Sequence, residues 1–151
     1  MNTITMNMIR IFDGDQVLIL DKVKRYGWEG LTFPGGKVEP YETLTDGAIR
    51  EVKEETNLDV KDLDLNGFIV WYDKDRDERL LGILYTANTF SGEVFDQTRE
   101  GKLFFMDYKE FLKVENKSDA MDDILSIYNG EYKEIVLYYE NNECIDRRRI
   151  K

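Results

Sequence analysis

A short acidic helix is the feature that most constrains how this chain can fold. Glu51, Glu54 and Glu55 stand at positions i, i+3 and i+4, so a helix gathers their carboxylates onto one face about one turn long. Like charges at this spacing repel one another unless a cation lies among them. Mg²⁺ takes oxygen ligands and is held by one or a few carboxylates together with waters and substrate phosphate. The acidic face therefore predicts a site for a hard divalent cation.

Local signals set the limits of this helix. It follows a Phe33-Pro34-Gly35-Gly36 turn, and Thr43 and Asp46 have the spacing of a helix start. Apolar residues then recur every four positions and form one stripe that is expected to be buried: Leu44, Ala48 and Val52. Arg50 stands one turn before Glu54 and is expected to pair with it, whereas Lys53 points elsewhere.

Glutamate-rich helices are common and usually only solvated, so the wider pattern decides the interpretation. Gly36 is followed after five residues by Glu42, and then after seven by Arg50-Glu51-Val52-Lys53-Glu54-Glu55. This stretch resembles the signature of the Nudix hydrolases, with Val52 and Leu58 in its apolar positions. Asn57 stands where that family usually has glycine. The glycine ends the helix in a left-handed conformation, and asparagine is the next most tolerant residue there.

The resemblance implies a metal-dependent hydrolase of a pyrophosphate bond. It implies that Mg²⁺, with Mn²⁺ as a substitute, is held by Glu51, Glu54, Glu55, a carbonyl of Gly35 and a further carboxylate from Glu100. It assigns catalysis to Glu51, Glu54, Arg50 and Glu42: Arg50 orients the glutamates and Glu42 braces the turn against the helix. The general base stays open among Glu51, Glu54 and Glu100. An ordinary surface position beside Arg99 is the alternative for Glu100.

The amino-acid composition limits which residues can carry out catalysis and which ligands the chain can bind. The chain has no histidine, so acid–base work falls to carboxylates, lysine, tyrosine or a metal-bound water. A formal net charge of −10 argues against binding a nucleic-acid polymer, while a nucleotide remains compatible if metal ions offset its phosphates. The single cysteine, Cys144, cannot form an internal disulfide, and neither a membrane-spanning run nor a signal peptide is evident. We therefore expect a cytoplasmic protein without membrane contact.

The substrate follows from a looser resemblance. The WEGLTFPGG entry and the FSGEV turn look most like bacterial mutator-type Nudix proteins, which cleave 8-oxo-dGTP to its monophosphate and pyrophosphate. ADP-ribose or dinucleoside-polyphosphate hydrolysis is one alternative, and a non-catalytic nucleotide-binding module is another. Asn116, Asp119 and Asp122 are candidates for base recognition, with helix capping as their ordinary role. The full set of predicted substrate contacts is Lys37, Arg25, Trp28, Asn116 and Asp122.

The remaining pattern predicts one domain of 151 residues. Apolar runs separated by turn residues predict strands at 3–12, 16–20, 30–33, 63–72, 79–89, 103–106 and 135–139. A second helix is expected over 118–129, with Ser118 as its cap, on the side of the sheet opposite the acidic helix. The basic residues 147–151 are expected to be a frayed, solvated tail. Together with the resemblance, these elements predict an α/β/α sandwich with a mixed sheet. A homodimer stays open.

Overall fold

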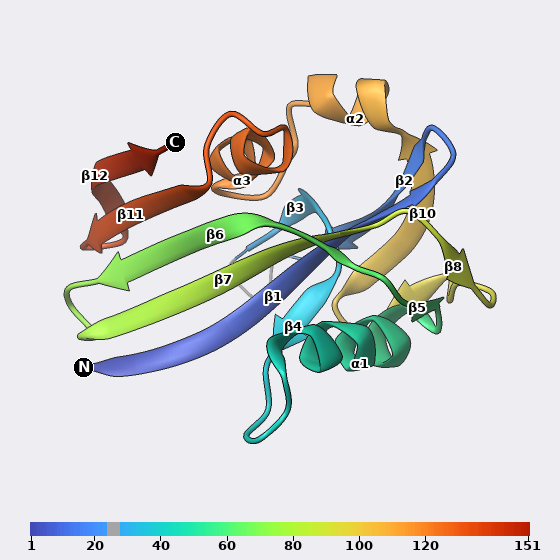
Figure 1. Ribbon diagram of the computed structural model, residues 1–151. Coiled ribbons are helices and arrows are strands. Elements are labelled where there is room, and N and C mark those ends of the chain that lie inside the picture. The colour runs from blue at the N-terminus through green and yellow to red at the C-terminus, as the bar shows by residue number, and fades with distance from the viewer. Residues whose placement is uncertain (24–27) are drawn as a thin grey trace.

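The computed structural model describes residues 1–23 and 28–151 and contains a large mixed sheet with helices against both faces (Figure 1). The predicted fold class is therefore confirmed. Helix α1 (Leu44–Thr56) covers one face, while α2 (Tyr108–Lys113) and α3 (Met121–Tyr128) cover the other. None of the helices in these two ranges is long and apolar enough to cross a membrane.

Two parallel pairings make the sheet mixed. Its strands follow the order β12 (Glu143–Ile150), β11 (Glu134–Glu140), β6 (Asp64–Asp73), β7 (Glu78–Ala87), β1 (Asn2–Asp13), β2 (Gln16–Lys22), β10 (Gly101–Asp107) and β9 (Gln97–Thr98). The β1–β7 and β6–β11 pairs are parallel, and the other pairs are antiparallel. Short strands β3 (Gly30–Thr32) and β4 (Gly35–Lys37) pair with β2 and β1, and β5 (Asp59–Val60) pairs with β8 (Phe90–Ser91).

Strand alternation divides the core into two layers. In β2, Val17 and Ile19 face the cluster that contains α2 and α3, whereas Leu18 and Leu20 face the cluster that contains α1. All four side chains are 1% exposed or less. This period of two explains why β2 reads as an unbroken apolar run: both of its faces are buried.

Helix α1 begins and ends where the sequence predicts. The Thr43 side chain accepts a hydrogen bond from the Asp46 N–H at 2.9 Å, and Asn57 closes the helix in the left-handed conformation at φ 71°. Ala48 and Val52 are fully buried, but Leu44 in the first turn is 43% exposed, so the predicted stripe is one residue shorter at its start.

The helical region after β10 differs from expectation. Helix α2, whose Asp107 cap accepts from the Glu110 N–H, was not predicted, because six residues are too few to show a helical period. Ser118 is not the cap of α3: its N–H donates to the Leu31 carbonyl at 2.9 Å beside β3. Ala120 takes the cap position at φ 66° and makes no side-chain capping bond.

The expected frayed tail is wrong, because residues 143–150 form strand β12. Asn141 and Asn142 both have positive φ, at 52° and 62°, and join Glu140 to Glu143 in a two-residue turn. Turns of this kind require two such residues and connect antiparallel strands, so the second strand follows from the turn. Every residue of β12 is exposed, as the composition of the tail suggests.

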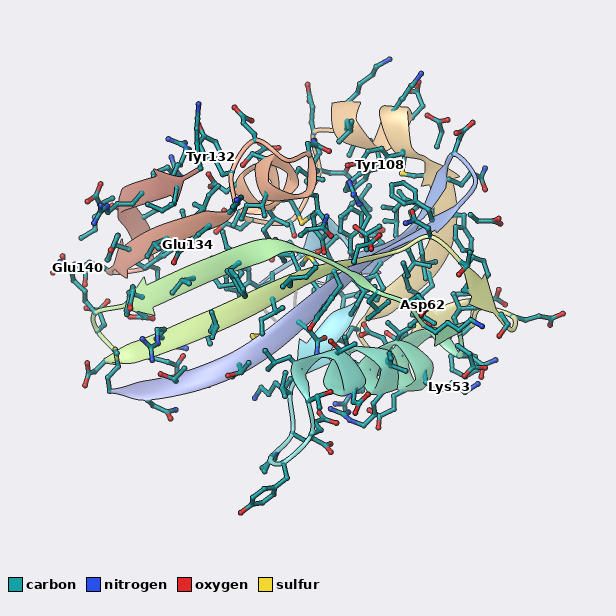
Figure 2. The ribbon with its side chains drawn as sticks, viewed as in Figure 1. Lys53, Asp62, Tyr108, Tyr132, Glu134 and Glu140 are labelled. Atoms are coloured by element: carbon teal, nitrogen blue, oxygen red, sulfur yellow. The ribbon has the colours of Figure 1, made fainter. Side chains whose placement is uncertain are left out.

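An arginine among aromatic rings joins β1 to the helices on the α2–α3 face. Arg10 donates to Thr86 Oγ1 at 3.2 Å and to Tyr108 Oη at 2.9 Å. Its guanidinium lies 4.9 Å from the Phe12 ring centre and 4.8 Å from that of Tyr128. Figure 2 shows Tyr108 close to α2, where its ring lies between that helix and the sheet. The planar cation therefore ties four elements together: β1, β7, α2 and α3.

We expect Arg10→Lys to lower the free energy of unfolding by about 2 kcal/mol. Lysine keeps the charge but loses the forked hydrogen bonds and the flat stacking surface, which contribute about 1 kcal/mol each. Urea unfolding followed by tryptophan fluorescence measures the change. The matched control is Arg76→Lys, whose side chain is 74% exposed, and a comparable loss there would contradict the assignment.

Candidate active site

The β4 turn, helix α1 and the segment before β10 meet around one hollow of about 460 Å³. We call it the acidic pocket. It is lined by Gly35, Gly36, Glu51, Glu54, Glu55, Phe95, Gln97, Thr98, Arg99 and Glu100. The helix spacing brings the three predicted glutamates to it, and β10 pairing with β2 brings Glu100 beside them. The predicted metal ligands thus all border the same hollow.

Arg50 holds the acidic residues in place. Its Nε and Nη2 donate to the two carboxylate oxygens of Glu42 at 3.0 and 2.7 Å, a bidentate pair. Nη1 lies 3.1 Å from both Glu51 Oε1 and Glu54 Oε2, and Nη2 also donates to the Lys37 carbonyl at 3.0 Å. The predicted Arg50–Glu54 pair is confirmed. Lys53 instead lies 3.2 Å from Asp59, on the side of α1 away from the sheet (Figure 2).

Glu42 is the most strongly ionised carboxyl of the group. The hydrogen bond from Arg50, followed by the bond from the Glu39 N–H, lowers the pKa of Glu42 to about 2. A Cβ added at Gly47 would crowd the Glu42 carboxylate, so this glycine leaves room for Glu42 over the first turns of α1. Glu42 therefore ties the loop before α1 to the helix as a fixed negative charge.

Glu55 and Glu51 have the opposite shift. Burial and then the neighbouring Glu100 carboxyl raise the pKa of Glu55 to about 9. Glu55 Oε2 accepts from the Gly35 N–H at 3.3 Å, and its Oε1 is buried without a hydrogen-bond partner among the described residues. Burial also raises the pKa of Glu51, although Arg50 opposes the shift. Burial beside a second carboxyl therefore favours the neutral form of Glu55 when no cation is present.

The oxygen atoms that line the acidic pocket are of the type that binds a hard cation. Carboxylate and carbonyl oxygens are the ligands that Mg²⁺ prefers, and an unpaired buried carboxylate oxygen is costly unless a ligand satisfies it. As the side chains stand, no three acidic groups within residues 1–23 and 28–151 converge closely enough to hold a metal ion. The reason is visible in the geometry, since Glu51 and Glu54 are both turned toward Arg50 Nη1. To bind one ion together, Glu51 and Glu54 would turn from Arg50 Nη1 toward that ion.

A second hollow lies on the opposite face of the sheet, against α3. Its inner part, of about 140 Å³, is mostly apolar and includes Met6, Met8 and Ile124. Its outer part, of about 410 Å³, reaches the β6–β7 turn and Tyr139. Both parts share the residues by which we name it the tryptophan pocket: Trp28, Trp71, Leu80 and Asp119. The two indole rings meet edge to face at 5.9 Å.

Shared lining residues connect the two pockets. A third hollow of about 490 Å³ borders the acidic pocket through Gln97, Thr98 and Arg99. It borders the inner tryptophan pocket through Lys22. The three hollows are thus linked in series by shared lining residues, and we call this series the track.

The predicted substrate contacts are not all placed along this track. Trp28 lines the tryptophan pocket, and Arg25 lies outside the described residues. Lys37 is exposed and contributes its carbonyl to Arg50. Asn116 accepts from the Leu31 N–H through its carbonyl, and the 94% exposed Asp122 pairs with Lys117. Of the three candidates for base recognition, only Asp119 lines the tryptophan pocket.

Several lining residues were missed by the sequence analysis. Trp71 and Leu80 come from adjacent strands, and their shared face is set by the β6–β7 register. The alternating pattern of both strands contains this information, but only once the register is known. Gln97 and Thr98 belong to a two-residue strand without any periodic signal.

The NUDIX domain family model matches residues 1–126. With the acidic helix, the Gly-Gly turn and the mixed sheet in place, the chain belongs to the NUDIX domain family. It is similar to the crystal structure of a MutT protein from Bacillus halodurans, with 27% sequence identity, a TM-score of 0.80 and coverage of 97% of each chain.

Two curated relatives share a shorter segment. An uncharacterized Nudix hydrolase, YvcI of Bacillus subtilis (strain 168), is 32% identical over 99 residues, which are 64% of this chain and 61% of the relative. An ADP-ribose pyrophosphatase of Methanocaldococcus jannaschii is 34% identical over 99 residues, which are 62% of this chain and 57% of the relative. The chain thus covers less than two thirds of the length of either relative.

We expect Glu42→Gln to remove a pH-dependent part of the stability of the metal-free protein. Because the pKa of Glu42 is lowered to about 2 in the folded state, its contribution is complete above its unfolded pKa near 4.5. That contribution is lost as the pH falls toward 2. The difference in unfolding free energy between wild type and variant should therefore shrink between pH 5 and pH 2. Urea titrations across this range measure it, and a pH-independent difference would contradict the predicted ion pair.

Proposed function

We propose that this chain is a Mg²⁺-dependent hydrolase that cleaves the pyrophosphate bond of a nucleoside di- or triphosphate derivative, with 8-oxo-dGTP or a related nucleoside triphosphate as substrate. The observation that carries the proposal is the acidic pocket, in which Glu51, Glu54, Glu55 and Glu100 border one hollow beside the Gly35–Gly36 turn. Glu51, Glu54, Glu55, Glu100 and the Gly35 carbonyl would hold Mg²⁺. The retained carboxylates count against a non-catalytic binding module.

The reaction is a displacement at phosphorus by water. When bound, Mg²⁺ neutralises charge on the phosphate oxygens. The water oxygen forms a bond to one of the two phosphorus atoms of the α–β linkage, the bond from that phosphorus to the bridging oxygen breaks, and the other half of the substrate leaves with the electron pair. A carboxylate takes the water proton, and since the chain lacks histidine, this role falls to Glu51, Glu54 or Glu100. Before the cation binds, Arg50 orients Glu51 and Glu54 through its two 3.1 Å contacts, and its bidentate pair with Glu42 ties it to the loop before α1.

The tryptophan pocket supports a purine at the other end of the substrate. Indole rings offer a flat apolar surface for a base, and the Asp119 carboxylate accepts hydrogen bonds from ring or exocyclic N–H groups. Tyr139 Oη donates to Asp119 Oδ2 at 3.3 Å and orients that carboxylate. Lys22, on the track between the pockets, is placed for a phosphate or sugar oxygen.

ADP-ribose is the second candidate, because one of the curated relatives is named an ADP-ribose pyrophosphatase. The same carboxylates would serve it, with the adenine in the tryptophan pocket and the second ribose elsewhere. Dinucleoside polyphosphates remain the third member of this group.

We expect purified protein with Mg²⁺ to hydrolyse 8-oxo-dGTP to its monophosphate and pyrophosphate in preference to dGTP, ADP-ribose and diadenosine polyphosphates. Product analysis by ion-exchange chromatography measures the preference. Glu54→Gln should lower kcat by at least about 100-fold without unfolding the protein, because it removes charge from the cation and the water. Full activity of Glu54→Gln would refute the metal site, and a preference for ADP-ribose would change the substrate while leaving the chemistry intact.

Asp119→Asn tests the base pocket separately. A hydrogen bond to a charged group contributes about 1.5–3 kcal/mol, so kcat/KM for 8-oxo-dGTP should fall roughly 10–100-fold. The loss should appear mainly in KM, because Asp119 lies outside the acidic pocket. Asp122→Asn, at a 94% exposed carboxyl of the same helix region, is the control and should leave kcat/KM unchanged. Equal effects of the two variants would indicate that the base binds at another surface.

A further inference from the structure

Asn7 is a buried polar residue that the proposed chemistry has not used. It lies in β1 and is only 5% exposed. Its side chain shares a strand face with Ile9 and Ile11, which pack in the same cluster as Ala48 and Val52 of α1. Asn7 therefore lies beneath the helix that carries the acidic residues.

The amide of Asn7 is oriented by the Gly-Gly turn. Gly36 is the partner of Asn7 in the β1–β4 pairing, and its N–H donates to Asn7 Oδ1 at 3.0 Å. Only the oxygen of an asparagine amide accepts a hydrogen bond, so this bond fixes which way the amide faces. The amide nitrogen, Nδ2, is left buried without a hydrogen-bond partner in the part of the chain that the structure describes. A buried donor without an acceptor is unfavourable, so a partner is expected for it.

The bond to Gly36 also sets the direction of the Gly35 carbonyl. The Gly35 carbonyl and the Gly36 N–H belong to one trans peptide unit, in which they point in opposite directions. Because the N–H points toward Asn7, the carbonyl points away from β1, on the edge of β4 that borders the acidic pocket. This carbonyl is the one proposed to bind the cation.

The Glu51 carboxylate lies next to Gly36, the strand partner of Asn7. A Cβ at Gly36 would collide with the Glu51 carboxylate, so that carboxylate packs directly on the residue that pairs with Asn7. At present Glu51 Oε1 is held by Arg50 Nη1 at 3.1 Å. If Glu51 leaves Arg50 to bind a cation, it loses this donor while it moves over the Asn7 amide.

We propose that Asn7 is a positioning residue of the metal site: its Oδ1 aims the Gly35 carbonyl through the Gly36 N–H, and its Nδ2 donates to Glu51 once Glu51 has exchanged Arg50 for the cation. The inference rests on the proposed function, because it requires that Glu51 and Gly35 serve a metal ion. Partners of this kind, which touch the ligands rather than the ion, commonly change metal affinity by about 10–100-fold.

The first test measures Mn²⁺ affinity by electron paramagnetic resonance without any nucleotide. Asn7→Leu removes both the acceptor and the donor at similar volume and should weaken Mn²⁺ binding by about 10–100-fold. Asn66→Leu is the matched control. Like Asn7 Oδ1, Asn66 Oδ1 accepts one hydrogen bond, in this case from Thr86 Oγ1 at 2.7 Å, but Asn66 lies in β6. The control should bind Mn²⁺ as tightly as wild type, and the two variants should have similar melting temperatures without metal. Wild-type affinity in Asn7→Leu would overturn the proposal.

The second test needs no substitution and decides the matter if Asn7→Leu does not fold. In ¹⁵N-asparagine-labelled wild type, Mg²⁺ should shift the side-chain NH₂ signals of Asn7 and slow their exchange with solvent, while those of Asn66 stay in place. Unchanged Asn7 signals at saturating Mg²⁺ would overturn the proposal. Both readouts are free of substrate, so a failed turnover panel leaves them standing. Conversely, normal turnover together with Asn7 signals that do not respond to Mg²⁺ would overturn the role of Asn7 and leave the proposed function intact.

Discussion

The structure around the acidic helix depends on one guanidinium group. Glutamates spaced by three and four residues repel one another on a helix, and their crowding is tolerated here because Arg50 contacts Glu42, Glu51 and Glu54 at 2.7–3.1 Å. The planar fork makes this arrangement possible, since a lysine ammonium cannot serve a bidentate carboxylate and two further carboxylates in fixed directions. The same group also binds the Lys37 carbonyl, so the β4 strand, the following loop and α1 share one anchor.

The carboxylates divide into two kinds because their surroundings differ. Glu42 is bound by two nitrogens of Arg50 and stays ionised to very low pH. Glu55 is buried beside Glu100, and burial followed by that neighbouring carboxyl raises the pKa of Glu55 to about 9, which favours its neutral form. Glu42 is thus the ion-paired carboxyl of the site and Glu55 the buried one. Packing, rather than residue type, separates their roles.

Helix α1 could be predicted from neighbouring residues in the sequence. The rest of the site could not, because it depends on the pairing of segments that are distant in the chain. The caps at Thr43 and Asn57 and the face shared by the glutamates follow from neighbours in the chain. Trp71 and Asp119 line the same pocket because the segment just before α3 packs against the face of β6. No pattern within either segment encodes this contact. Strand β12 was missed for a different reason: its side chains are all exposed, so no alternation marks it, and only the Asn141–Asn142 turn reveals it.

Strand β12 lies at an exposed edge of the large sheet. In the described part of the chain it forms one end of the strand order, with β9 at the other end, and its backbone offers a template for an added strand. Charged side chains on such an edge are one of the means by which proteins prevent sheets from recruiting further chains. Arg147 and Arg149 bind Asp123 of α3, whereas Arg148 lies on the opposite face of the strand. Arg147 and Arg149 thereby attach β12 to α3. The positive charge of the edge opposes pairing with a strand of another sheet.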